Sequence, residues 1–490
     1  MDLLIRRSGN LIDISPDGSS PLPREIQELL RPHLTYEHRT LLRGHDRYAS
    51  TGDQRSVDVE VRQLYAVEEG RVTTAFGLWS RLVPVLQQAG HTLHCVDLSP
   101  ERMRPQAWTA DWANCQQRMH FRSGQQESLA AITQSWGGVI DAPTGFGKTF
   151  LFEAMCHLFP HAKIDIVVRP KDVAERIVRQ LTNSLPNVGI VGAGRNQPGP
   201  RITVYTAGSL HRSDGDADFL LADEAHNLIT ERTSQELAKY RFSRNFGFTA
   251  TPKGRLDNAD VRLEMFFGQV IFRMSYSMGV AAGLVCPIRV RWLPICMERN
   301  PAAGKADVPK MRWGIWRNDV RNLAIVQDIY QTYAADTQIL VLCATIEHAV
   351  YLGHHLPDFE LCYSSMDDVN FEMYKRQGLL RPDAPRMTPE YREQLRRGFE
   401  AGTVRRVIAT DVWATGVDFA SLQVLYRVDA RESTILDTQA PGRVSRLADG
   451  KTYGEVVDCL DAFDPSFRRK AERRRSHYNK LGWEQAWPRC

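Results

Sequence analysis

APTGFGKT at residues 142–149, DEAH at 223–226, TATP at 249–252 and QAPGRVSR at 439–446 are the four stretches that decide the fold of this chain. The first alone indicates only a loop that binds phosphate. In this order the four supply phosphate-binding, acidic, hydroxyl and cationic groups in turn. The sequence therefore predicts an α/β protein with a nucleotide-driven motor built from two lobes.

The segment around APTGFGKT has the strand, loop and helix that a phosphate-binding loop needs. GGVIDA at 137–142 is a short apolar run that ends at a turn, which predicts a buried strand, and the residues after Lys148 have helical spacing. Gly145 and Gly147 let backbone N–H groups close around a polyphosphate, and the start of the helix adds donors and a positive dipole end. Ala142 stands where this motif usually has glycine.

The residues of this loop predict ATP and Mg²⁺ as cofactors. Lys148 is expected to pair with the β- and γ-phosphates, and the hydroxyl of Thr149 is expected to bind Mg²⁺, a hard cation that prefers oxygen ligands. An ordinary glycine-rich turn with a solvated lysine is the alternative, and the flanking strand and helix argue against it. The ATP-binding residues predicted here are Thr144, Gly145, Phe146, Gly147, Lys148 and Thr149.

An acidic pair follows a second apolar run, in DADFLLADEAHN at 216–227. FLLA predicts a strand, and ligands of parallel sheets bind at the carboxyl ends of the strands. Asp223 is expected to hold Mg²⁺ through a water molecule, and Glu224 to polarise the attacking water for in-line displacement at the γ-phosphate. His226 could link the nucleotide state to the next strand by a hydrogen bond. A solvated helix start is the alternative, which the preceding strand disfavours.

Further strands and a pair of arginines predict the second lobe. ILVLCATIEHA at 339–349 predicts a strand and the start of a helix, and residues 405–429 begin and end with strands around a glycine-containing loop. In QAPGRVSR, Arg443 and Arg446 are three residues apart, a spacing that on a helix puts both on one face. Such a cation pair from the opposite lobe can stabilise a phosphoryl group in transfer, as arginine fingers do. A surface arginine pair is the alternative.

The ordered motifs resemble those of the superfamily 2 helicases and translocases, over about residues 120–460. FRSGQQESLAAI at 121–132 resembles the segment that precedes the phosphate loop in that family. VVRPKDVAERI at 167–177 and ITVYTAGSL at 202–210 resemble motifs Ia and Ib, which line the nucleic-acid track, and ATDVWATGVDF at 409–419 resembles motif V. The resemblance therefore extends across both predicted lobes.

Two motifs favour one branch of this superfamily. FGFTATP at 246–252 resembles LTATP, and QAPGRVSR fits QxxGRxxR, the strings of a DNA-directed branch that includes the phage helicase UvsW, XPB-type repair helicases and RecG. RNA helicases of the DEAD group usually show different strings at both places. For single positions, the resemblance implies three further roles. ATP contacts are implied for Gln125 (near the adenine), Gly416 and Asp418. Coupling of the nucleotide state is implied for His226, Thr249, Thr251 and Gln439, and nucleic-acid contacts for Arg169, Pro170, Thr206, Thr345 and Thr410. The predicted catalytic residues are Lys148, Glu224, Arg443 and Arg446, and the predicted Mg²⁺ ligands are Thr149 and Asp223.

The composition of the chain constrains the class of protein less strongly than the motifs do. The chain has 490 residues, with 62 lysines and arginines, 58 acidic residues and a net charge of +4, so a nucleic-acid surface must be a local basic region. Its nine cysteines form no CxxC pair and no His/Cys cluster at metal spacing, which is typical of reduced thiols. No apolar run approaches the roughly twenty residues of a membrane span, and MDLLIRRSGN lacks a signal-peptide core. A cytoplasmic protein is expected.

We expect four parts in the chain: an N-terminal α+β domain at 1–105, RecA-like lobes with parallel sheets at 106–285 and 286–464, and a basic helical tail at 465–490. The first part alternates strand-like and helix-like segments before the Pro- and Arg-bearing SPERMRPQ. It would help to grip duplex or branched DNA, or serve only in packing. Residues 366–386 interrupt the usual passage from strand to helix, as a wedge or as a plain surface loop.

The tail is the most basic segment of the chain. From Arg468 to Lys480 it carries seven lysines and arginines and one acidic residue, with Tyr478 and Trp483 nearby. Basic residues with interleaved aromatics can hold phosphates and stack on bases, and a solvated helix face is the alternative. The resemblance of HYNKLGWE to the tails of UvsW-like helicases favours packing for the two aromatic residues.

The leading interpretation is an ATP-dependent DNA helicase or branch-migration translocase, which the resemblance implies moves 3′ to 5′. It would serve recombination, repair or replication restart, with a phage as one expected source. The expected partner is branched, forked or single-stranded DNA, with RNA as a lesser candidate. No membrane partner is expected, and the sequence does not indicate which proteins bind the chain. One alternative is a duplex DNA translocase that does not separate strands, such as the motor of a restriction or defence system. Another is an RNA helicase, which TATP and QAPGRVSR disfavour, and a non-catalytic clamp is disfavoured because no catalytic position is lost.

Overall fold

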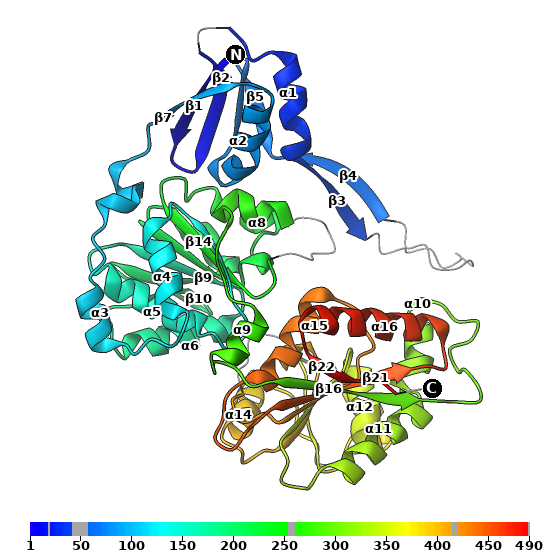
Figure 1. Ribbon diagram of the computed structural model, residues 1–490. Coiled ribbons are helices and arrows are strands. Elements are labelled where there is room, and N and C mark those ends of the chain that lie inside the picture. The colour runs from blue at the N-terminus through cyan, green and yellow to red at the C-terminus, as the bar shows by residue number, and fades with distance from the viewer. Residues whose placement is uncertain (18–19, 42–56, 253–259, 414–418, 489–490) are drawn as a thin grey trace. The chain divides into compact units, whose positions relative to one another are not determined.

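The computed structural model describes residues 1–17, 20–41, 57–252, 260–413 and 419–488 (Figure 1). The chain divides into two compact units, Met1–Ser275 and Tyr276–Cys490. The division falls before helix α9 (Tyr276–Ala281), whereas the sequence predicts it after residue 285. Within the described ranges, no helix is both long enough and apolar enough to cross a membrane.

A small mixed sheet at the start of unit 1 confirms the α+β character predicted for the N-terminal region. Its strand order is β5-β6-β2-β1-β7, in which β1 and β7 are parallel and the other neighbours antiparallel. Helices α1 (Arg24–Leu30) and α2 (Trp79–Gln88) bury Leu30 and Leu82 in a common core with the sheet. The strands are β1 (Asp2–Ser8), β2 (Leu11–Pro16), β5 (Tyr65–Glu68), β6 (Arg71–Ala75) and β7 (Thr92–Asp97), and β3 (Thr35–Leu41) pairs with β4 (Val57–Gln63) as a separate hairpin.

Direct contacts hold this N-terminal region against the rest of unit 1. The Asn10 side chain donates a hydrogen bond to the Tyr240 carbonyl oxygen at 2.8 Å. The Arg7 guanidinium lies between the rings of Phe76 and Trp136, 3.6 and 3.7 Å from their centroids. Because a cation between two aromatic faces is attracted to both, Arg7 joins a ring of the N-terminal region to one of the lobe that follows.

Eight strands form the larger sheet of unit 1, in the order β11-β10-β12-β9-β13-β14-β8-β15. Every neighbouring pair except β10 and β11 is parallel. Strand β9, IDIVV, is buried along its whole length, as expected for a parallel strand that is covered on both faces. The strands are β8 (Gly138–Asp141), β9 (Ile164–Val168), β10 (Gly189–Gly192), β11 (Arg195–Gln197), β12 (Ile202–Thr206), β13 (Phe219–Asp223), β14 (Arg244–Thr249) and β15 (Val270–Arg273), and the helices are α3 (Trp112–Arg118), α4 (Gln125–Gln134), α5 (Lys148–Leu158), α6 (Lys171–Thr182), α7 (Glu231–Leu237) and α8 (Asp260–Phe267).

Unit 2 contains the second parallel sheet, in the order β18-β19-β17-β20-β21-β16-β22. Two parallel sheets with crossover helices confirm the predicted pair of RecA-like lobes. The strands are β16 (Ile288–Ile295), β17 (Ile339–Leu342), β18 (Glu360–Cys362), β19 (Arg406–Ala409), β20 (Val424–Arg427), β21 (Gly454–Asp461) and β22 (Glu484–Ala486), and the helices after α9 are α10 (Asp307–Met311), α11 (Asp319–Thr332), α12 (Ile346–His354), α13 (Asp368–Arg376), α14 (Pro389–Glu400), α15 (Thr434–Gln439) and α16 (Pro465–Lys480).

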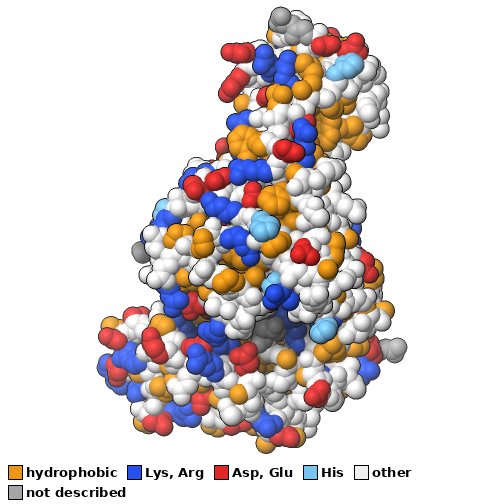
Figure 2. All heavy atoms as spheres, turned by 90° about the vertical axis from the view of Figure 1, so that its left-hand side faces the viewer, with side chains coloured by type: hydrophobic (Ala, Val, Ile, Leu, Met, Phe, Trp, Pro, Cys, Tyr) orange, Lys and Arg blue, Asp and Glu red, His pale blue; other side chains and the backbone are white. Residues whose placement is uncertain are grey.

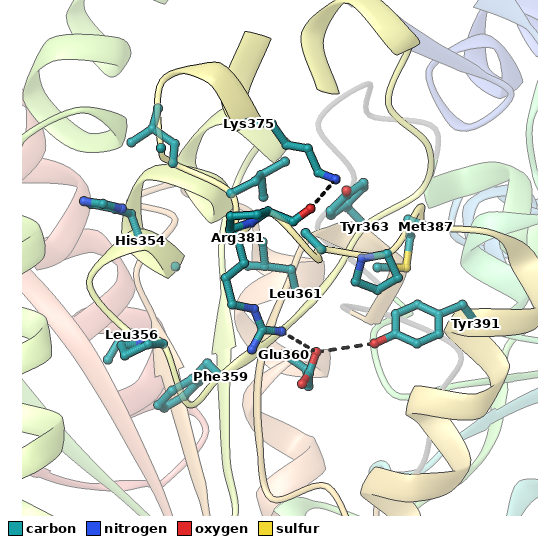
Figure 3. Close-up of a pocket in the computed structure, with 18 residues that line it drawn as sticks. His354, Leu356, Phe359, Glu360, Leu361, Tyr363, Lys375, Arg381, Met387 and Tyr391 are labelled. Atoms are coloured by element: carbon teal, nitrogen blue, oxygen red, sulfur yellow. Dashed lines mark hydrogen bonds and ion pairs between the residues drawn. The ribbon is translucent and has the colours of Figure 1, made fainter. Parts of the chain in front are cut away.

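Residues 366–386 form helix α13 and a loop that returns towards α14. Phe371 of α13 is buried in a small hydrophobic cluster that α12 shares. The loop lines a cavity of about 300 Å³ together with β18 and α14, where Glu360 lies 3.6 Å from Arg381 and 3.4 Å from the Tyr391 hydroxyl (Figure 3). The alternative of a plain surface loop is therefore wrong, because apolar side chains of the insertion pack with residues of α12 in one cluster. A role as a wedge stays a prediction.

The C-terminal tail is built into unit 2. Strand β22 extends the sheet beside β16, and α16 packs against β21. Tyr478 is fully buried and Trp483 is 5% exposed, which confirms that these two aromatic residues pack. Arg474 is also buried and binds both carboxylate oxygens of Asp458, at 2.8 and 3.0 Å. The exposed cations on this helix are Arg468, Arg469, Arg473 and Lys480.

We expect Arg474→Ala to destabilise unit 2 by about 3 to 5 kcal/mol, because it leaves the Asp458 carboxylate buried without its cation. Arg468→Ala is the matched control on the same helix. Its guanidinium pairs with Glu472 at the surface, and the loss of an exposed pair should cost less than about 1 kcal/mol. Urea unfolding followed by tryptophan fluorescence measures both changes. Equal destabilisation by the two substitutions would contradict the placement of Arg474 in the core.

Charged side chains of both signs are interspersed on the face of the molecule shown in Figure 2. Lysines and arginines lie among acidic and apolar side chains on both units, as the near balance of 62 basic and 58 acidic residues leads one to expect. A nucleic-acid surface would therefore depend on particular groups rather than on overall charge.

Candidate nucleotide and nucleic-acid sites

Three neighbouring strands of unit 1 end at, or lead into, residues predicted for the nucleotide site and its coupling. The sheet places β13, β14 and β8 side by side and parallel, so the loops that follow them meet at one edge. Asp223 ends β13, Thr249 ends β14, and the loop after β8 leads to Lys148. The order of the strands thus brings together motifs that lie far apart in the sequence.

Two glycines shape the loop between β8 and α5. Gly145 and Gly147 have φ angles of 101° and 94°, in the left-handed region that favours glycine. A Cβ atom on Gly147 would lie 2.7 Å from Nε2 of Gln125. Helix α5 begins at Lys148, so its first N–H groups and its positive dipole end lie at the end of this loop. The loop fits a bound polyphosphate.

Gln125 braces the same loop from the start of α4. Its side chain is buried, with Oε1 accepting from the Arg122 backbone N–H at 2.8 Å and Nε2 donating to the Phe146 carbonyl oxygen at 2.7 Å. The Arg122 guanidinium also donates to the Gly145 carbonyl oxygen at 3.3 Å. The sequence motif predicts Gln125 but does not single out Arg122. The position of Arg122, three residues before Gln125, is the one feature of the sequence that could have indicated it. Contact of Gln125 with adenine stays a prediction.

The three other loop residues differ in exposure. Phe146 is fully buried, and its ring stacks on Phe272 with centroids 5.7 Å apart. Only the backbone of Phe146 could therefore contact a nucleotide. Thr144 and Thr149 are both partly exposed, so their hydroxyl groups could reach a ligand.

Lys148 and Glu224 meet across the site. The Lys148 ammonium lies 2.8 Å from Oε1 of Glu224, and both side chains are at least partly buried. Glu224 has a φ of 44° and a ψ of 51°, a left-handed backbone that costs a residue with a side chain about 1 to 3 kcal/mol. Such strain persists where the surrounding structure fixes it. The ion pair with Lys148 is one contact that holds the Glu224 side chain in this position.

The surroundings of Asp223 raise the pKa of its carboxyl group, and a bound cation would counteract that rise. Burial raises its pKa to about 6, the Glu224 carboxylate adds to the rise, and Lys148 and Arg176 oppose it. A divalent cation would stabilise the ionised form. In the described part of the chain, no group of three or more His, Cys, Asp or Glu residues could hold a metal ion. Mg²⁺ bound by Asp223 and Thr149 would take further ligands from phosphate oxygens and water, which this cation prefers.

The predicted hydrogen bond between DEAH and the next strand is present. His226 is buried, and its Nδ1 lies 2.7 Å from Oγ1 of Thr249 and 3.4 Å from Oγ1 of Thr251. The Thr251 backbone N–H also donates to Oγ1 of Thr249 at 3.0 Å. The same imidazole nitrogen lies 3.6 Å from Oε2 of Glu224. One side chain therefore contacts both Glu224 and the TATP segment.

The nucleic-acid residues predicted in unit 1 follow the strands next to the nucleotide site. Arg169 follows β9 and is exposed, and Pro170 caps helix α6. Thr206 ends β12, but its side chain is buried and its hydroxyl bonds to that of Ser209 at 3.1 Å. Of these three residues, Arg169 has the side chain that is most open to a phosphate.

The corresponding residues of unit 2 lie after two adjacent strands. Thr345 follows β17 and caps α12, with its hydroxyl accepting from the His348 backbone N–H at 3.2 Å. Thr410 follows β19 and is 7% exposed. Gly416 and Asp418, predicted to contact ATP, lie outside the described residues.

The arginine motif lies at the end of a helix rather than within one. Gln439 ends α15, and Arg443 is buried in a 3₁₀ turn at Pro441–Ser445. Arg446 has extended backbone angles, with φ −66° and ψ 140°. The prediction of one shared helical face is wrong for Arg446, because the Ser445 carbonyl oxygen accepts from the Cys286 backbone N–H at 2.8 Å where the turn ends.

Two family models match the sequence. Residues 118–254 match the model described as "Type III restriction enzyme, res subunit", and residues 321–448 match "Helicase conserved C-terminal domain". The first range contains the phosphate loop, DEAH and TATP, and the second contains QAPGRVSR. No curated protein matches the chain.

Three solved structures are similar to this chain at low sequence identity, and two of them have a TM-score above 0.5. A fragment of a putative HsdR subunit of a type I restriction enzyme from Vibrio vulnificus has a TM-score of 0.53 and 17% identity, over 80% of this chain and 72% of that one. Dbp5 of S. cerevisiae, bound to RNA and ADP BeF3, has a TM-score of 0.51 and 13% identity, over 76% and 91%. T4 UvsW has a TM-score of 0.43 and 15% identity, over 99% of each chain.

Proposed function

We propose that this chain, which carries both motor domains of the superfamily 2 helicases, couples ATP hydrolysis to movement along DNA. The observation that carries the proposal is the meeting of Lys148 and Glu224, 2.8 Å apart, at the edge where three motif-bearing strands end. A phosphate-binding cation and a candidate base meet there beside a glycine loop. This is the arrangement that phosphoryl transfer to water requires.

The two charged residues would divide the work of hydrolysis. Lys148 would exchange the Glu224 carboxylate for phosphate oxygens when ATP binds, which frees Glu224 to orient the attacking water and take its proton. Mg²⁺, bound by Thr149 and through water by Asp223, would offset the negative charge of the phosphates. His226 would report the state of Glu224 to Thr249 and Thr251.

Unit 2 would complete the site. The resemblance implies that Arg443 and Arg446 act on the γ-phosphate of ATP and that Gln439 couples their movement. Arg443 is 5% exposed in its 3₁₀ turn, so its side chain would have to turn outward to reach the γ-phosphate. Gly416 and Asp418 are proposed to contact the nucleotide from the same lobe.

The proposed substrate is DNA, in a branched, forked or single-stranded form. TATP and QAPGRVSR support DNA over RNA, and the proposed direction is 3′ to 5′, in recombination, repair or replication restart. Arg169 would bind a phosphate with its side chain. Thr206 and Thr410 are buried, so they would offer backbone groups or would have to rotate.

A second candidate is a duplex translocase of a restriction or defence system, which would not separate strands. The match of residues 118–254 to a restriction-enzyme subunit favours it. Both candidates share the ATP site, and they differ in which DNA stimulates hydrolysis.

ATP hydrolysis with four nucleic acids tests the proposal. We expect single-stranded and forked DNA to stimulate turnover strongly, and RNA of the same sequence to stimulate it little. Stimulation by blunt duplex DNA alone would favour the duplex translocase. Stimulation by RNA above that by every DNA would contradict the assignment of a DNA substrate.

A further inference from the structure

The arginine turn continues directly from a short helix. Helix α15 (Thr434–Gln439) leads into the turn at Pro441–Ser445, where the Arg443 backbone N–H donates to the Ala440 carbonyl oxygen at 3.2 Å. The Ala440 N–H in turn donates to the Leu436 carbonyl oxygen at 3.1 Å. The backbone hydrogen bonds are therefore continuous from helix to turn. A helix this short is unstable alone, so its place must come from side-chain contacts.

Two successive side chains of α15 make those contacts. Oγ1 of Thr438 lies 2.8 Å from Nε2 of His477 on α16. The buried carboxylate of Asp437 accepts from the Arg427 guanidinium of β20 at 2.7 Å. These are the two residues before Gln439. Asp437 fixes α15 to strand β20, and Thr438 fixes it to the C-terminal helix α16.

One face of α16 completes a buried network. Arg474, His477 and Tyr478 have the i, i+3, i+4 spacing that puts side chains on one side of a helix. The Tyr478 hydroxyl accepts from Arg427 at 2.8 Å and donates to Asp458 at 2.9 Å. Arg474 binds the same Asp458 carboxylate through two hydrogen bonds. Because breaking a buried ion pair leaves a charge without its partner, these contacts hold α16 in one place.

We propose that α16 positions the arginine turn for ATP hydrolysis, through the hydrogen bond between Thr438 and His477. The inference rests on the proposed role of Arg443. Arg474 and Tyr478 already anchor α16, so the bond from His477 adds little to the stability of the helix. This hydrogen bond joins α16 to Thr438, the residue before Gln439. It limits how far α15 can shift, and Arg443 with it. Thr438 and His477 are thus positioning residues rather than catalytic ones.

Single substitutions test the bond. Thr438→Val and His477→Ala should each lower kcat for DNA-stimulated hydrolysis by about 10- to 100-fold, the range for a group held slightly out of place. KM for ATP should stay within about twofold, since a displaced transition-state contact lowers kcat with little effect on ground-state binding. His477→Gln should recover most of the loss, because its amide can bond to the same hydroxyl.

A double-mutant cycle separates positioning from damage to the fold. If α16 acts through Arg443, adding His477→Ala to Arg443→Ala should lower kcat no further. A variant that only reduces the folded fraction would lower kcat by the same factor in both backgrounds. Ser476→Ala is the control, because it removes an exposed hydroxyl group from the same helix and leaves its cations in place.

Three outcomes would overturn the inference. They are multiplicative losses in the double mutant, a fall in the melting temperature that accounts for the whole loss of kcat, and failure of His477→Gln to recover activity. Failure of the proposed function shows differently. In that case Arg443→Ala alone would hydrolyse ATP at the normal rate, whatever the substitutions on α16 do.

Discussion

Glu224→Gln should bind ATP normally and hydrolyse it about 10² to 10⁴ times more slowly than the unchanged chain, the usual contribution of a general base. An amide has nearly the shape of the carboxylate but cannot take a proton from water. It also removes a negative charge that lies 2.8 Å from Lys148, beside the place where phosphates would bind. ATP affinity should therefore be unchanged or higher.

Binding of a fluorescent ATP analogue and release of phosphate measure the two effects separately. Glu231→Gln is the matched control, since it makes the same chemical change on an exposed side chain of unit 1. A Glu224→Gln protein with normal turnover would rule out Glu224 as the base. Loss of ATP binding together with turnover would point instead to a structural role in the loop.

Arg443→Ala should lower kcat by about 10³ or more if Arg443 acts as an arginine finger. The charge of the transferring phosphoryl group would lose a cation that matters most in the transition state, so nucleotide affinity should change less than kcat. Arg443→Lys should recover little, because an ammonium lacks the planar fork of the guanidinium.

Arg446→Ala gives a comparison within the same motif. Arg446 lies beyond the 3₁₀ turn, with extended backbone, so the two arginines need not contribute equally. Turnover should be measured with saturating DNA and ATP. Normal hydrolysis by both single mutants would mean that neither arginine touches the γ-phosphate.

Local chemistry made much of the nucleotide site predictable. Gly145 and Gly147 were recognisable because a loop that wraps phosphate needs backbone that other residues rarely adopt. The apolar runs before Lys148 and Asp223 marked buried strands. The sequence also suggested a link from His226 to the next strand, and the bond to Thr249 is present.

Features that depend on tertiary contacts could not be predicted from local sequence patterns. The run RRKAERRRSHYNK suggests a basic surface, but Asp458 on a distant strand decides that Arg474 faces the core while Arg468 stays outside. Helical spacing suggested one face for Arg443 and Arg446, but a backbone bond from Cys286 accompanies the end of the turn between them.

Movement along single-stranded DNA tests the central claim most directly. Oligonucleotides carrying streptavidin on a biotin at the 5′ or the 3′ end report directed movement, because a motor that reaches the end speeds release. We predict ATP-dependent release from the 5′ end, as expected for 3′ to 5′ movement, and no release by Glu224→Gln. ATP-dependent release from the 3′ end alone would correct the direction. Normal hydrolysis in the presence of DNA, without faster release from either end, would contradict the claim that ATP drives this chain along DNA.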